Sequence, residues 1–261
     1  MRLALFALAS LSLLACSVRT TETDPAPADD GAMKLPAPAD PPPAKTPAKS
    51  EPVSQPAADT TGFAEVVTVQ MRDRLHQLWF CTGTLLAKDR VITAAHCLDT
   101  DKFVSYEVLA QNAAGKPRVS ASKPRVFGGT FEDPANPDIG WLTLDTPILL
   151  PAYAELTDVV AHVEAGEGVI ATAVVRTDKV PTAPFFVESP MPVTSTVQYG
   201  YEHGFGTPMF SKGGDSGAGL FLVENGQRTR KLIGVARQPE PERDLDHFTR
   251  IDPAFLAWYA E

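Results

Sequence analysis

The chain has 261 residues, of which 44% are hydrophobic and 21% charged, and its formal net charge is −9. This composition is typical of a globular protein, and the acidic balance argues against nucleic acid as a partner. Only three cysteines are present, and the 24 prolines are concentrated near the N-terminus.

Residues 1–15 have the pattern of a secretory signal peptide. One arginine precedes an apolar stretch that is too short to cross a bilayer comfortably, and small residues follow. The stretch "LLAC", which ends at Cys16, resembles the bacterial lipobox. That resemblance implies cleavage before Cys16 and attachment of lipid to its sulfur and new amino group, which meets the need for more than one chain in stable anchoring. The alternative is an ordinary signal peptide with a coincidental cysteine.

Residues 16–61 contain many prolines and alanines and almost no large apolar side chains. Such a segment cannot bury enough surface to offset chain entropy, so we expect a disordered tether. Residues 62–261 then form the folded domain. If Cys16 is lipidated, Cys81 and Cys97 remain as a pair in an oxidising compartment, where we expect a disulfide worth about 3 kcal/mol.

A metal site made of Cys81, His96 and Cys97 is the alternative for these cysteines. No fourth ligand occurs at a typical spacing, and adjacent histidine and cysteine ligands are unusual in closed zinc sites. We therefore expect neither a metal nor another cofactor.

The stretch "CTGTLLAKDRVITAAHC" (residues 81–97) resembles the segment of trypsin/chymotrypsin-like serine proteases that carries the catalytic histidine. The resemblance implies that His96 is the general base, and it assigns the bridge between Cys81 and Cys97 to the family's disulfide beside the histidine. Imidazole suits this role because its ordinary pKa lies near neutral pH.

The segment "NPDIGWLTLD" resembles the family's Asp-Ile-Ala-Leu segment, with Gly140 in place of alanine, and implies that Asp138 orients the histidine. Asp145 and Asp133 are the competing carboxylates. Asp138 lies between the other two motifs in the family's order of histidine, aspartate and serine.

The stretch "GGDSGAGLF" resembles the family's Gly-Asp-Ser-Gly-Gly-Pro motif. It implies that Ser216 is the nucleophile and that the N–H groups of Gly214 and Ser216 form the oxyanion hole. The surrounding glycines give the backbone the freedom to turn both N–H groups inward.

The resemblance implies an all-β fold of two six-stranded antiparallel β-barrels of the chymotrypsin type with a short C-terminal helix. Short apolar runs such as residues 64–71, 103–110, 168–175 and 192–200 alternate with turn residues, which independently favours a barrel or sandwich. Asp252 as N-cap and Pro253 at the first position predict the helix near the C-terminus.

Three features depart from the family. No Ile-Val-Gly-Gly terminus occurs near residues 56–65 to pair with Asp215 after cleavage. Lys212 stands where the first cysteine of the pocket disulfide would be. The pocket floor falls on Phe210, which cannot attract a basic side chain, whereas Asp246 could supply a negative charge from another wall.

The sequence therefore predicts an exported, membrane-anchored serine endopeptidase that acts on protein or peptide substrates. Ser17 after the lipidated cysteine indicates an outer-membrane lipoprotein of the bacterial cell envelope, or a secreted protein if Cys16 carries no lipid. The alternative function is a catalytically silent homologue that binds peptides or envelope partners.

Overall fold

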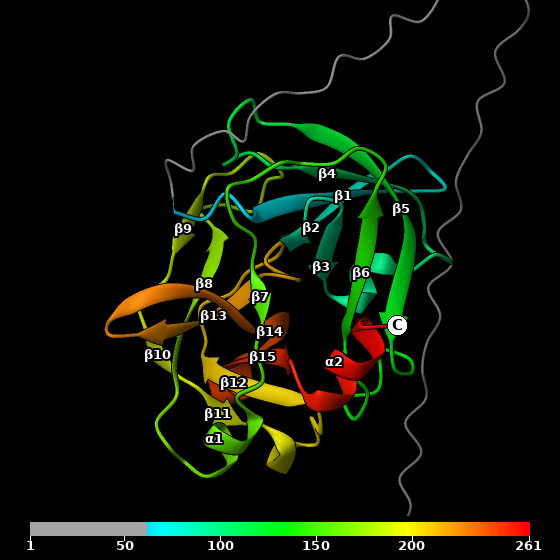
Figure 1. The fold of residues 1–261 in the computed structure, drawn as a ribbon. Helices are drawn as coiled ribbons and strands as arrows, with labels where there is room; N and C mark the ends of the chain where they lie inside the picture. Colours follow the sequence, from blue (N-terminus) through cyan, green and yellow to red (C-terminus); the bar gives the residue numbers. More distant parts are fainter. Residues whose placement is uncertain (1–61) are drawn as a thin grey trace, which may run out of the picture. The chain divides into compact units, whose positions relative to one another are not determined.

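The computed structural model of the chain describes residues 62–261 (Figure 1). The signal peptide predicted at 1–15, the lipid site at Cys16 and the tether predicted for 16–61 lie outside the described residues. Within residues 62–261, no helix has the length and apolar character needed to span a membrane.

The first half of the described chain is a closed antiparallel barrel of six strands. The strands are joined in the order β1-β2-β3-β6-β5-β4, and β4 pairs back with β1. Their bounds are β1 (Val66–Asp73), β2 (Leu78–Ala87), β3 (Arg90–Thr93), β4 (Phe103–Leu109), β5 (Arg118–Phe127) and β6 (Ile139–Leu144). Apolar side chains, mostly alanine, valine and leucine, form the buried cluster of this barrel.

The second half is a nine-stranded sheet whose main path runs β10-β8-β13-β14-β15-β12-β11. The strands are β7 (Glu155–Leu156), β8 (Ile170–Arg176), β9 (Phe185–Val187), β10 (Met191–Pro192), β11 (Thr194–Ser195), β12 (Gly204–Pro208), β13 (Gly219–Glu224), β14 (Gln227–Glu240) and β15 (Leu245–Arg250). Strand β7 pairs with β14, and β9 pairs with β8. The short helix α1 (Val160–Glu164) precedes β8.

The all-β fold of the chymotrypsin type is therefore confirmed. The second half differs from the predicted six-stranded barrel because it is a nine-stranded sheet with two short edge strands. The two edge strands β10 and β11 have two residues each and are separated only by Val193, so the chain crosses from one edge to the other at a single corner. Pro192 also lacks the N–H that a ladder needs. The apolar run at 192–200 is also not one strand. It contains the end of β10, the two residues of β11 and a 3₁₀ turn at Val197–Tyr199.

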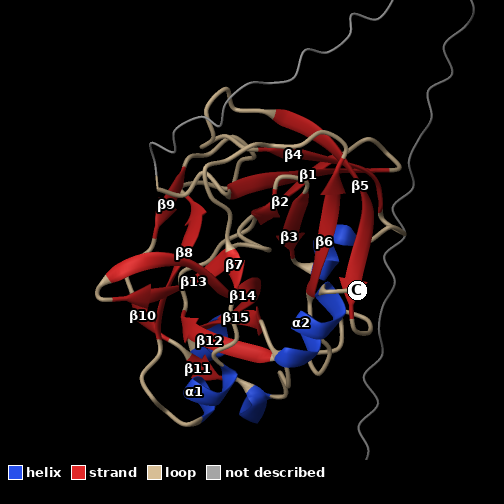
Figure 2. Ribbon diagram, viewed as in Figure 1, coloured by secondary structure: helices blue, strands red, loops and turns tan. Residues whose placement is uncertain are grey.

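The two halves share a buried cluster at their boundary. Ile92 and Ile139 of the barrel meet Val174 and Phe221 of the sheet in this cluster. Phe255 of helix α2 (Pro253–Tyr259) belongs to the same cluster, so the C-terminal helix packs where the halves meet (Figure 2). As predicted, the Asp252 side chain caps α2 by accepting a hydrogen bond from the Phe255 N–H at 2.8 Å.

Candidate active site

His96 lies on a short 3₁₀ turn, Ala95–Leu98, directly after β3. The predicted disulfide joins Cys97 of this turn to Cys81 of β2. The Thr93 hydroxyl donates a 2.7 Å hydrogen bond to the carbonyl of Thr82, which ties β3 to β2 just before the turn. The imidazole is therefore carried by a segment that is fixed on both sides.

Asp138, the residue directly before β6, holds both the ring and the backbone of His96. Its Oδ2 lies 2.7 Å from His96 Nδ1, and its Oδ1 accepts a 2.9 Å hydrogen bond from the His96 backbone N–H. The carboxylate is 2% exposed. Because an ionised carboxylate only accepts hydrogen bonds, this contact assigns the proton to Nδ1 and leaves Nε2 as an acceptor.

Thr249 of β15 connects this carboxylate residue to the second half of the molecule. Its hydroxyl accepts a hydrogen bond from the Asp138 N–H at 3.1 Å and donates one to the Asp138 carbonyl at 3.2 Å. The competing carboxylates are engaged elsewhere: Asp145 accepts from the Ser122 hydroxyl, and Asp133 accepts from the Ala135 N–H. Of the three candidates, the structure brings Asp138 to His96.

Ser216 lies on the turn before β13, about 120 residues from His96 along the chain. It lines the same open cavity of about 490 Å³ as His96 and Asp138. Among residues 62–261, no hydrogen bond joins the Ser216 hydroxyl to the imidazole. Such contacts are often long in unliganded sites and tighten when substrate binds.

The backbone around Ser216 leaves two N–H groups available. Neither the Gly214 N–H nor the Ser216 N–H donates a hydrogen bond to another group of the described chain. Gly214 has φ +96°, and a Cβ there would lie 2.3 Å from the Phe80 ring. The Gly214 carbonyl is held away from the cavity because it accepts hydrogen bonds from the Thr82 hydroxyl at 2.9 Å and from Arg176 Nε at 3.3 Å. These features suit an oxyanion hole.

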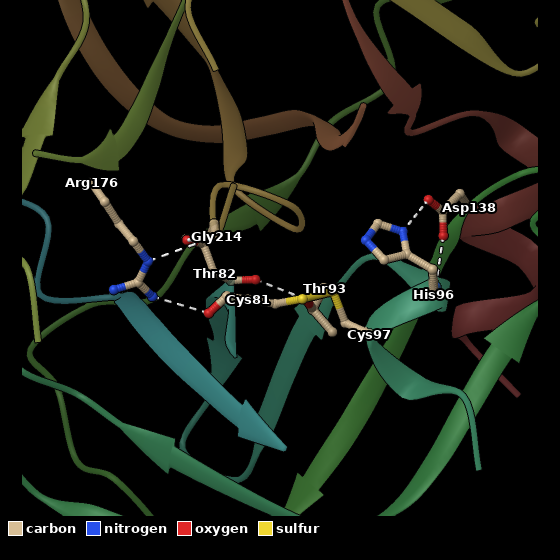
Figure 3. Close-up of a disulfide and its surroundings, with 8 residues drawn as sticks. All are labelled: Cys81, Thr82, Thr93, His96, Cys97, Asp138, Arg176 and Gly214. Carbon is tan, nitrogen blue, oxygen red and sulfur yellow. Dashed lines mark hydrogen bonds and ion pairs between the residues drawn. A yellow bond between two sulfur atoms is a disulfide. The ribbon is translucent and has the colours of Figure 1, made fainter. Parts of the chain in front are cut away.

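A buried arginine, which the sequence analysis did not identify, supports this turn. Arg176 ends β8 and is fully buried. Besides the Gly214 carbonyl, its guanidinium donates to the Cys81 carbonyl at 3.0 Å, the Thr68 hydroxyl at 2.9 Å and the Pro181 carbonyl at 3.1 Å. Figure 3 shows this side chain reaching Gly214 and Cys81 on one side of the disulfide, with His96 and Asp138 on the other.

Asp215, for which the sequence offers no Ile-Val-Gly-Gly terminus as a partner, bonds to the backbone of the same arginine. Asp215 is buried, and its carboxylate accepts hydrogen bonds from the backbone N–H groups of Arg176 and Lys212, each at 3.0 Å. Burial raises the pKa of Asp215, while these N–H donors and the charges of Lys212 and Arg176 oppose the rise. Burial lowers the pKa of Arg176 to about 10, and the charge of Asp215 opposes this change. The sequence signal that could have identified Arg176 is its place as a charged residue at the end of the apolar run "IATAVVR".

The structure does not place the two expected pocket residues on the cavity beside Ser216. Asp246 is 1% exposed, and its carboxylate accepts hydrogen bonds from the N–H groups of Phe210 and Ser211 at 2.7 Å and from the Ser211 hydroxyl. The Phe210 ring packs toward Phe248, 6.2 Å away. Backbone donors thus occupy Asp246, because the chain between β12 and the Ser216 turn folds directly over it.

The cavity is lined instead by residues from both halves of the molecule. Phe131 and Glu132 come from the loop before β6, Lys212 and Gly213 from the Ser216 turn, and Arg237, Gln238 and Pro239 from β14. The donor atoms of Cys81, His96 and Cys97 lie within 4.8 Å of one another. Because the two sulfurs are bonded to each other, they cannot act as thiolate ligands for a metal.

Comparisons with known proteins concern the family and the fold. The family model described as Trypsin matches residues 53–258. Comparison with curated protein sequences gives no match.

Several solved protease structures share the fold. A structure titled HL collagenase has a TM-score of 0.61 and 17% identity, over 78% of this chain and 94% of that chain. An inactivated protease paralogue of the scabies mite, S-I1, has a TM-score of 0.58 and 19% identity, over 78% and 95%. The protease Anisep from Arthrobacter nicotinovorans has a TM-score of 0.57 and 13% identity, over 78% and 96%. At these identities the likeness concerns the fold alone.

Proposed function

Since this chain belongs to the trypsin family, we propose that it is an active serine endopeptidase that hydrolyses peptide bonds through an acyl-enzyme on Ser216. The observation that carries the proposal is the 2.7 Å contact between His96 Nδ1 and the buried Asp138 carboxylate. Both residues line the same cavity as Ser216. A histidine held in this tautomer presents Nε2 as a base toward the cavity.

The chemistry follows from these groups. The Ser216 hydroxyl gives its proton to His96 Nε2 while Oγ bonds to the scissile carbonyl carbon, and the N–H groups of Gly214 and Ser216 stabilise the negative oxygen. The C–N bond then breaks, and the proton on Nε2 passes to the leaving amine. Water attacks the acyl group by the same route, which releases the acid product and restores Ser216.

A fluorophosphonate probe tests this proposal because it reacts with activated serine hydroxyls. We expect the full chain to be labelled at Ser216, and labelling to be lost in Ser216→Ala and His96→Ala. Ser211→Ala is a matched control, since this hydroxyl lies in the same segment but bonds to Asp246. Absence of labelling in every processing state of a folded chain would contradict the proposal and favour the silent homologue.

We also propose that the protein is exported and anchored to a membrane by lipid on Cys16. Support comes from the "LLAC" stretch and from the proline-rich residues after it, which would give the protease domain reach from a surface. The position of Ser17 favours the bacterial outer membrane. Mass spectrometry of the mature N-terminal peptide should show acyl mass, and the protein should partition into detergent. An unmodified, water-soluble product with an intact Cys16 thiol would refute the anchor, and Cys16→Ser is the control.

A further inference from the structure

Arg237 occupies an unusual position on β14. The register of β14 against β15 shifts between Ala236 and Gln238, so Arg237 is the extra residue of a β-bulge. Bulges of this kind redirect a side chain and are common beside active sites. Here the side chain is 7% exposed, and it also lines the cavity that contains His96 and Ser216.

The guanidinium of Arg237 binds four carbonyl groups of one loop. Nη1 donates to the carbonyls of Asn136 at 2.8 Å and Pro134 at 3.3 Å. Nη2 donates to the carbonyls of Phe131 at 2.7 Å and Asp133 at 3.0 Å. A planar fork of N–H donors can satisfy this set, whereas a lysine ammonium has three donors at a single point.

The loop held in this way, residues 131–136, leads directly to the site. It connects β5 to β6 in the first barrel, and β6 begins immediately after Asp138. Phe131 and Glu132 form one wall of the cavity, and the Phe131 ring lies 6.2 Å from the His96 ring. Because β14 belongs to the second half, Arg237 connects that half to a loop of the first half beside the cavity.

Within residues 62–261, Arg237 forms no ion pair with a carboxylate. Its four partners are neutral carbonyls, and the Tyr201 ring lies 5.2 Å from the guanidinium carbon. A buried charge without a carboxylate needs several hydrogen bonds to replace water, and the 131–136 loop supplies them. The arginine and the loop conformation therefore depend on each other.

We propose that Arg237 is a positioning residue of the active site. Its guanidinium holds the 131–136 loop so that Phe131 and Glu132 form the cavity wall and Asp138 stays against His96. This inference rests on the proposed peptidase function for its kinetic part. Its structural part, the dependence of the loop on Arg237, stands on the four hydrogen bonds.

The test compares Arg237→Met and Arg237→Lys with Arg228→Met in the full chain. Arg228 is a matched control because it is also a mostly buried arginine of β14 that reaches the first half, where it pairs with Glu65 at 2.8 Å. Neither of these two residues lines the cavity. Amide hydrogen exchange of residues 128–138 is measured by mass spectrometry, together with kcat and KM for an extended peptide. The rate of fluorophosphonate labelling of Ser216 is followed in the same samples.

For Arg237→Met, we expect lost exchange protection confined to residues 128–138, a higher KM and a fall in kcat/KM of about 10- to 100-fold, as displacement of a positioned group produces. Arg237→Lys should recover part of the protection and part of kcat/KM. Arg228→Met should lower stability but leave the kinetic constants of the folded protein unchanged.

Unchanged protection of residues 128–138 in folded Arg237→Met or Arg237→Lys would overturn the inference, and so would kinetic losses equal to those of Arg228→Met. If Arg237→Met does not fold, Arg237→Lys decides the question. If the wild-type chain neither labels nor cleaves peptide, the proposed function fails, whereas hydrogen exchange still reports whether Arg237 holds the loop.

Discussion

Replacing Arg176 with methionine tests how the Ser216 turn is held. Methionine keeps an unbranched apolar stem in the buried site but removes the guanidinium and its four hydrogen bonds, including the one to the Gly214 carbonyl. Asp215 then becomes a buried carboxylate without its neighbouring buried cation. The variant therefore removes one member of a buried set of charges and leaves the other.

The expected magnitude follows from that imbalance. Each buried acceptor that loses its donor costs about 1 to 3 kcal/mol, so loss of the guanidinium and of its charge near Asp215 should lower the free energy of unfolding by about 3 to 5 kcal/mol. For a domain of this size, that corresponds to a fall in Tm of about 6 to 20 °C. Because the Gly214 carbonyl loses one of its two donors and keeps the Thr82 hydroxyl, the oxyanion-hole turn should shift, and fluorophosphonate labelling should slow by up to about 10²-fold in the protein that remains folded.

The pH dependence identifies Asp215 as the affected group. Burial already raises the pKa of Asp215 above its ordinary value of 3.8, and loss of the Arg176 charge raises it further. A carboxyl group whose folded pKa is raised favours the folded state below pH 3.8 and loses this contribution as pH rises through the folded pKa. The stability deficit of Arg176→Met should therefore be smaller at acidic pH than at alkaline pH.

Urea denaturation followed by tryptophan fluorescence measures the deficit at each pH. Arg74→Met, at an exposed arginine, is the control and should be close to wild type. In an Asp215→Asn background, Arg176→Met should cost less, because no buried charge is left unpaired. Equal deficits across the pH range, or the same cost with and without the Asp215 carboxylate, would refute this reasoning.

Three further predictions concern the site and its frame. Asp138→Asn should keep the fold but reduce the rate of fluorophosphonate labelling by up to about 10⁴-fold, because an amide can donate to Nδ1 and favour the wrong tautomer. Replacing both Cys81 and Cys97 with alanine should lower the free energy of unfolding in urea by about 3 kcal/mol, since the bridge closes a short loop with a sequence separation of 16. A peptide-library cleavage profile should show no selection for lysine or arginine before the scissile bond, because the Asp246 carboxylate is buried and bonded to Phe210 and Ser211.

Each of these predictions has a result that would contradict it. Asp138→Asn labelled at the wild-type rate would remove the role given to the carboxylate. A cysteine double variant as stable as the wild type under oxidising conditions would show that the bridge constrains little. Strong cleavage after basic residues, abolished by Asp246→Asn, would place a free charge in the pocket.

The sequence by itself identified the parts of this molecule that depend on local chemistry. The glycines around Ser216 indicate positive φ angles, found at Gly214 and Gly217. The sequence Asp252-Pro253 predicts the start of a helix, which α2 confirms. The pair Cys81 and Cys97 followed from cysteine usage and compartment, and it is bridged. In each case a few neighbouring residues carry the physical cause.

Only the tertiary structure decided which distant groups satisfy each buried charge. Arg176 and Gly214 are 38 residues apart, and Arg237 lies more than 100 residues from the loop it binds. The sequence did not distinguish whether the Asp246 carboxylate faces the cavity or the backbone, and in the structure it accepts hydrogen bonds from the backbone N–H groups of Phe210 and Ser211. A buried ionic group must find hydrogen bonds wherever packing brings donors or acceptors, and a one-residue bulge such as that at Arg237 redirects the side chain entirely. Pairing of this kind depends on how the two halves pack together, which short-range sequence patterns do not encode.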